Sequence, residues 1–178
     1  VTPAQGRSGQ VIATGGLSDL AKESVTNISA VVKKLTGKDI QDYDLHVQFP
    51  GTHNVDGDSA SITMATAIIS AFEGVPIDQN LAMTGSLSVR GEVLPIGGVS
   101  AKIEAAVKSG IERVIIPRSN LQDVLIDEKY ESMVEVLPVD SLDEVLQHAL
   151  VGAEEKVSLV ERLANVIDTI SRGPETQP

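Results

Sequence analysis

The hydrophobic and polar positions of this chain follow two periods, one typical of strands and one typical of helices. Residues 43–49 repeat every second position through Leu45, Val47 and Phe49, which predicts a strand with one buried face, and residues 10–14 predict another strand. Residues 18–35 carry apolar side chains at helical spacing, and Gly37 is expected to end that helix. The alanine-rich apolar run at 59–73 is long for a strand and predicts a buried helix.

The same alternation continues toward the C-terminus. Further strands are predicted at 81–89, 92–94, 113–117 and 134–138. Further helices are predicted at 99–108, 122–129, 141–150 and 153–171, and residues 173–178 are expected to form a frayed tail. The helix at 141–150 opens on the capping-box pattern of Ser141 and Glu144. Strands that alternate with helices predict an α/β (α+β) fold.

Length and composition limit the kind of protein. A chain of 178 residues fits a single domain, here 1–178 with a core at about 9–150. The formal net charge of −11 argues against binding to nucleic acid or to an anionic membrane. The absence of cysteine excludes disulfides, cysteine-ligated metals and a thiol nucleophile. No apolar run is long enough to cross a membrane, and the start lacks both Met and a signal peptide, so we expect a piece of a longer protein.

One hydroxyl lies at the junction between a polar glycine loop and the apolar helix at 59–73. Ser59 follows Asp56, Gly57 and Asp58, and serine is common as the N-cap of a helix. A helix N-terminus also offers free backbone N–H groups that can stabilise an oxyanion. Ser59 is therefore either a cap or a nucleophile, and the second role needs a nearby base.

Two side chains are candidates for that base. His53 lies in the same loop as Ser59, which leaves a Ser–His hydrolase open, although an isolated loop histidine is usually solvated. Lys102 is flanked by Val99, Ala101 and further apolar residues, and an amine in such a setting can lose its charge and act as a base. The alternative is that Lys102 extends from its helix to water. In that case the chain is a non-catalytic binding or ring-forming module.

These stretches together resemble a known family. Residues 56–64 are similar to the serine signature of the Lon ATP-dependent proteases, and Thr84-Gly85, residues 90–98 and Lys102 are similar to the lysine region of that family, in the same order. Ser59 and Lys102 are 43 residues apart, as in the family's Ser–Lys dyad. The resemblance covers about residues 9–150.

The subtype is indicated by a departure from the bacterial pattern. Asp58 and Ser61 stand where the bacterial form usually has Pro and Gly, and this is similar to the archaeal, membrane-tethered subtype. The resemblance implies a compact Lon-type proteolytic domain that lacks its AAA+ ATPase module. It also implies a homo-hexameric ring, protein or peptide substrates, and a full-length protein in the cytoplasm, tethered to the cytoplasmic face of the membrane through segments outside this chain. No cofactor or metal is expected in this domain, because ATP and Mg²⁺ would be used by the missing module.

The resemblance also assigns roles to single residues. Ser59 would be the nucleophile and Lys102 the general base of a serine endopeptidase that works through an acyl-enzyme. Thr84 matches a threonine near the dyad, and His46 matches a supporting histidine on the strand before the serine loop. Asp56 and Asp58 lie so close to Ser59 that either could pair with Lys102 and hold it cationic in a resting form.

Overall fold

The computed structural model describes residues 1–5, 11–14, 19–37, 43–49 and 57–152, together with positions 157, 159–162, 164, 165 and 167. The strands are β1 (Thr2–Gln5), β2 (Val11–Thr14), β3 (Tyr43–Gln48), β4 (Leu81–Met83), β5 (Ser86–Leu87), β6 (Val93–Leu94), β7 (Arg113–Pro117) and β8 (Glu135–Val139). The helices are α1 (Asp19–Thr36), α2 (Ser61–Glu73), α3 (Val99–Lys108), α4 (Glu128–Glu131) and α5 (Leu142–Ala149), with a 3₁₀ helix at Arg118–Asp123. The predicted α/β class is confirmed.

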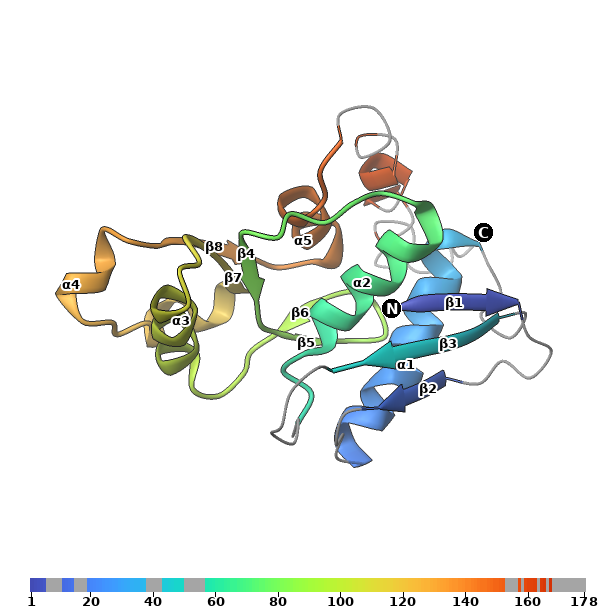
Figure 1. Ribbon diagram of the computed structural model, residues 1–178, viewed down its shortest axis with the longest axis horizontal. Helices are drawn as coiled ribbons and strands as arrows, with labels where there is room; N and C mark the ends of the chain where they lie inside the picture. The colour runs from blue at the N-terminus through green and yellow to red at the C-terminus, as the bar shows by residue number, and fades with distance from the viewer. Residues whose placement is uncertain are drawn as a thin grey trace, which may run out of the picture.

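Two small sheets lie on opposite sides of the central helix α2 in the view of Figure 1. The first has the order β1-β3-β2, with β1 antiparallel and β2 parallel to β3. The second has the order β4-β7-β8 and is entirely parallel. A two-stranded antiparallel ribbon, β5-β6, lies between them.

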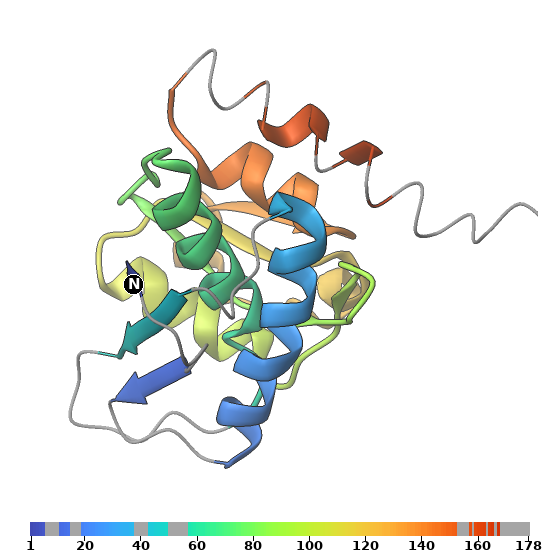
Figure 2. The ribbon, with the colours of Figure 1, turned by 90° about the vertical axis from the view of Figure 1, so that its right-hand side faces the viewer.

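Helix α2 lies at the centre and contacts both halves. It packs beside α1, as Figure 2 shows, and it also contacts α5, β1 and β5. Its residues Ile62, Ile68 and Ile69 are fully buried in the larger hydrophobic cluster. A second cluster is built from Val99, Ile103, Val114 and Ile116, and it fixes α3 against β7. Burial of apolar faces therefore holds both α2 and α3 in place.

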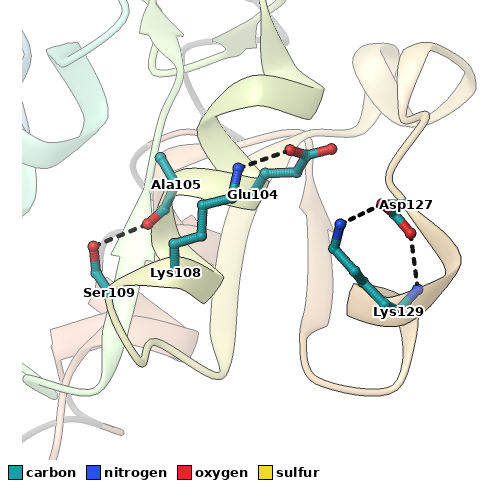
Figure 3. A network of polar contacts seen from close by, with 6 residues as sticks. All are labelled: Glu104, Ala105, Lys108, Ser109, Asp127 and Lys129. Carbon is teal, nitrogen blue, oxygen red and sulfur yellow. Dashed lines mark hydrogen bonds and ion pairs between the residues drawn. The ribbon is translucent and has the colours of Figure 1, made fainter.

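The outer end of α3 faces α4 across a polar surface (Figure 3). Lys108 pairs with Glu104 at 3.2 Å within α3, and Lys129 pairs with Asp127 beside α4. The Nζ atom of Lys108 also lies 5.5 Å from the ring centroid of Tyr130 on α4. Exposed ion pairs of this kind contribute little to stability, so the buried cluster rather than this surface holds α3.

The structure corrects the sequence prediction at four places. The predicted helix at 122–129 is wrong, because the chain forms the 3₁₀ helix at Arg118–Asp123 and then the short α4. The predicted strand at 81–89 is interrupted between β4 and β5. Strand β1 was not predicted. Ser141 is the N-cap of α5 but makes no side-chain capping bond, and Glu144 accepts from the backbone N–H of Asp140 rather than from that of Ser141.

The remaining predicted elements agree with the structure within one or two residues, apart from those near the C-terminus. The helix predicted at 153–171 lies largely outside the described residues, and the tail at 173–178 lies wholly outside them. Among the described helices, none is long and apolar enough to cross a membrane.

Candidate active site

Ser59 stands in a tight bend immediately before α2. The N-cap of α2 is Ala60, and no side chain caps this helix end. The Ser59 hydroxyl is therefore not the cap, and it points to another partner. The neighbouring Ser61 hydroxyl instead donates to the carbonyl of Asp58, which closes the bend locally.

That partner is Lys102, which lies in the first turns of α3. Its Nζ atom is 2.7 Å from Ser59 Oγ and 3.2 Å from Thr84 Oγ1. The Thr84 hydroxyl donates to the carbonyl oxygen of Ser59 at 3.1 Å. Thr84 is buried, so its hydroxyl has a fixed role: it donates to the Ser59 backbone and accepts from the Lys102 amine.

The backbone between β4 and β5 fixes Ser59 relative to both sheets. The N–H of Gly85 donates to the Ser59 carbonyl at 2.8 Å, and the Gly85 carbonyl accepts from the N–H of Ile62 at 3.2 Å. The N–H of Thr84 donates to Ile115 of β7 at 3.1 Å. At the interruption between β4 and β5, the backbone groups of Thr84 and Gly85 therefore connect the serine loop to the second sheet by hydrogen bonds.

Burial lowers the pKa of Lys102 below its ordinary value, and the negative charge of Asp58 opposes this with a smaller upward effect. Asp58 and Lys102 form no ion pair in the structure. The Asp58 carboxylate accepts a hydrogen bond from Ser86 at 2.6 Å, while Lys102 bonds to Ser59 and Thr84. Lys102 therefore loses its proton more readily than an exposed lysine does.

A pocket of about 460 Å³ opens beside the dyad. Its lining residues are Gly57, Asp58, Ser59, Pro95, Ile96, Gly97 and Lys102. Asn120, a residue outside every motif, holds the backbone of this wall at Ile96. Its side chain accepts from the N–H of Ile96 at 2.8 Å and donates to the carbonyl of Ile96 at 3.0 Å. No sequence signal marks Asn120, since its importance depends on two segments that meet only in the fold.

The remaining predicted site residue that the structure describes is not joined to the dyad. His46 is an exposed residue of β3, and it makes no hydrogen bond to Ser59, Thr84 or Lys102. Asp56 and His53 lie outside the described residues. Within the part of the chain that the structure describes, no group of three or more His, Asp or Glu side chains could hold a metal ion.

This arrangement has the chemistry of an activated nucleophile. A hydroxyl within hydrogen-bond distance of an amine with a lowered pKa can give up its proton as it attacks. The N–H groups of Ser59 and Ala60 donate to no oxygen of the described residues, which makes them candidate donors to an incoming anion. The pocket gives such a group access to the hydroxyl.

Comparison with known proteins agrees with this chemistry. Residues 2–152 match the model of the Lon protease (S16) C-terminal proteolytic domain. The chain is 54% identical over 170 residues to the archaeal Lon protease of Methanothermobacter thermautotrophicus, covering 94% of this chain and 26% of that protein. It is 55% identical over 164 residues to the archaeal Lon protease of Archaeoglobus fulgidus, covering 91% of this chain and 26% of that protein.

A bacterial relative is less similar. The identity to the Lon protease of Azorhizobium caulinodans is 37% over 162 residues, covering 86% of this chain and 19% of that protein. The chain thus spans about a quarter or less of the length of these relatives. The predicted family and enzyme class are confirmed. The chain belongs to the family of Lon protease C-terminal proteolytic domains, which are serine endopeptidases.

Proposed function

We propose that this domain hydrolyses peptide bonds with Ser59 as the nucleophile and Lys102 as the general base. The observation that carries the proposal is the 2.7 Å hydrogen bond between Ser59 Oγ and Lys102 Nζ, together with the lowered pKa of Lys102. An amine that is neutral near physiological pH can accept the proton of the hydroxyl, whereas an ordinary lysine cannot.

The reaction proceeds in two stages. Ser59 Oγ attacks the peptide carbonyl while neutral Lys102 takes the hydroxyl proton, and the resulting ammonium then donates that proton to the leaving amine. Water next attacks the acyl-enzyme with Lys102 again as the base, which releases the acid and restores Ser59. The N–H groups of Ser59 and Ala60, which donate to no oxygen of the described residues, are our candidates for the donors that stabilise the oxyanion in both stages.

Thr84 is a positioning residue in this scheme. It accepts from Lys102 and donates to the Ser59 backbone, so one hydroxyl sets the distance between base and nucleophile. Asp58, or Asp56, would hold Lys102 cationic in a resting form from which substrate or assembly releases it. His46 is assigned a supporting role only.

The proposal also covers the full-length protein of which this domain would be a part. The relatives named Lon protease are several times longer than this chain, and we propose that an ATPase module, fuelled by ATP and Mg²⁺, feeds unfolded or regulatory proteins to this domain within a homo-hexameric ring. The full-length protein would act at the cytoplasmic face of the membrane and be tethered there by segments outside this chain. Residues 1–178 would form the single proteolytic domain of that assembly.

The dyad is tested with a fluorogenic peptide and the variants Ser59→Ala and Lys102→Ala. We expect each to abolish cleavage while thermal unfolding stays cooperative, because each removes one partner of the same proton transfer. Ser109→Ala and Lys108→Ala, on the outer end of α3, are the matched controls and should retain activity. Mass spectrometry after treatment with a serine-reactive phosphonate should show one adduct, at Ser59. Full activity in either dyad variant would contradict the proposal.

A further inference from the structure

Gly97 is the one described glycine that the fold itself does not require. Seven of the nine described glycines have a positive φ, which favours glycine on conformational grounds: Gly37, Gly57, Gly74, Gly91, Gly98, Gly110 and Gly152. Gly85 is required by packing, because a Cβ there would lie 3.0 Å from the Cδ1 of Ile62 and 3.1 Å from the Cγ1 of Val93. Gly97 has neither a positive φ nor any atom within 4 Å of a Cβ built on it.

The place of Gly97 offers a different reason for the missing side chain. It lines the dyad pocket together with Ser59 and Lys102, and it is exposed. Its N–H and carbonyl make no hydrogen bond with any residue that the structure describes. A main-chain donor and acceptor that have no partner among the described residues, beside a nucleophile and with no side chain in front of them, suit a partner that approaches backbone to backbone.

The residue before Gly97 is held by a buried side chain. Asn120 is 4% exposed, and it occupies both the N–H and the carbonyl of Ile96. Its amide also donates to the carboxylate of Asp123 at 2.9 Å, which fixes its orientation. Asn120 thus occupies both backbone groups of Ile96, and Gly97 is the next residue of the pocket lining, with no described partner for its own backbone groups.

We propose that the main chain of an extended polypeptide substrate crosses the wall of the dyad pocket at Gly97 and pairs with its N–H and carbonyl. Gly97 is then a specificity-determining residue, because any side chain there would occupy the space that the substrate backbone takes. Asn120 is a positioning residue that acts through Ile96. This inference rests on the proposed function of Ser59 and Lys102.

The test compares Gly97→Ala and Gly97→Val with the wild-type chain. Ordinary φ and open space around the Cβ mean that both variants should unfold at the wild-type temperature. We expect kcat/KM for a fluorogenic peptide to fall roughly 10-fold in Gly97→Ala and 100-fold or more in Gly97→Val, mainly through KM, since a side chain in the binding pocket blocks substrate before chemistry. A small serine-reactive phosphonate, which does not reach along the wall, should label Ser59 at a rate within about twofold of wild type. The matched control is Gln122→Val, an exposed position outside the dyad pocket, which should leave both readings unchanged.

The outcomes separate this inference from the proposed function. Normal phosphonate labelling with unchanged peptide kinetics in Gly97→Val overturns the inference alone. A lower unfolding temperature in Gly97→Ala also overturns it, because the fold would then require the glycine. A wild-type chain that neither reacts with the phosphonate nor cleaves peptide overturns the proposed function and this inference with it.

The role of Asn120 is measured with Asn120→Asp and with the double variant Asn120→Asp/Asp123→Asn. The single variant removes the donor to the Ile96 carbonyl and places two carboxylates next to each other. We therefore expect the unfolding temperature to fall and KM to rise. The double variant relieves the repulsion but still lacks the donor. We therefore expect it to regain thermal stability while KM stays several-fold above wild type. Recovery of KM together with stability would show that Asn120 is merely structural.

Discussion

The ionisation of Lys102 is set by two opposing influences, and one of them can be removed by a single substitution. Burial lowers its pKa, and the charge of Asp58 raises it. Asp58→Asn removes the charge but keeps an oxygen that can accept from Ser86. We expect the pKa of Lys102 to fall further, so the acidic limb of kcat/KM against pH should move to lower pH, because the neutral amine then persists under more acidic conditions.

The control for this experiment is Glu128→Gln, which removes one negative charge from an exposed position on α4 and should leave the pH profile unchanged. Movement of the acidic limb to higher pH in Asp58→Asn would contradict the assignment of Lys102 as the base.

The hypothesis that a carboxylate pairs with Lys102 in a resting form also predicts higher peptidase activity in Asp58→Asn or in Asp56→Ala. If neither variant is more active at neutral pH, no resting carboxylate–lysine pair limits the enzyme.

Thr84 contributes through one hydroxyl with two partners. Thr84→Val keeps the shape of the side chain but removes the acceptor for Lys102 and the donor to Ser59. We expect kcat to fall about 10- to 100-fold, consistent with about 1.5–3 kcal/mol for a lost hydrogen bond to a charged group. Thr84→Ser restores the hydroxyl and should recover most of the activity. Equal loss in the valine and serine variants would show that the methyl group, rather than the hydroxyl, is required.

At the scale of elements, the junction between β4 and β5 decides how closely α2 approaches the second sheet. A Cβ on Gly85 would press against Ile62 of α2 and Val93 of β6. We expect Gly85→Ala to lower the free energy of unfolding by about 1–3 kcal/mol, as overpacking of a buried contact does. Chemical denaturation measures this, and Gly97→Ala, at an open position, is the control that should show no loss. Wild-type stability in Gly85→Ala would mean that the junction relaxes freely.

The sequence predicted the long elements well because their apolar spacing is itself the cause of their burial. Helices α1 and α2 carry such patterns, and both are found near their predicted bounds. The helix predicted at 122–129 does not form, because the Asn120 side chain holds the distant backbone of Ile96 and the Asp123 carboxylate accepts from the Asn120 amide, which fixes this segment as a 3₁₀ turn. Strand β1 was missed because its main support is non-local pairing with β3 rather than its own pattern.

The residues of the candidate site also fall into two groups, those that a sequence motif marks and those that only the fold reveals. Ser59, Lys102 and Thr84 were singled out because they match motifs, and the structure brings all three within hydrogen-bond distance. Asn120 and Ser86 carry no motif, and they became visible only once the fold placed them against Ile96 and Asp58. The open space at Gly97 likewise depends on what surrounds it in three dimensions.

At the scale of the whole molecule, the dyad joins two halves. Ser59 enters from the loop before the central helix α2, whereas Lys102 belongs to α3 beside the second sheet (Figure 1). Helix α2, which follows Ser59, packs in the larger hydrophobic cluster, and α3, which carries Lys102, packs in the smaller one, so the short distance between the two side chains depends on the packing of both helices. Activity therefore reports on the relative placement of the halves as well as on the two side chains.

Net charge governs how copies of this domain meet. Each chain carries a formal charge of −11, so copies repel one another over distances of about 10 Å at 0.1 M salt and much less at 1 M. If the domain forms the proposed ring by itself, assembly should increase as salt screens this repulsion. Sedimentation velocity at NaCl concentrations from about 0.02 M to about 0.5 M measures the degree of assembly, and choline chloride is the control for specific cation binding. Both concentrations lie below about 1 M, where screening is nearly complete. Dissociation on adding salt would mean that attractive ion pairs between copies outweigh their net repulsion, and the charge argument would then be wrong.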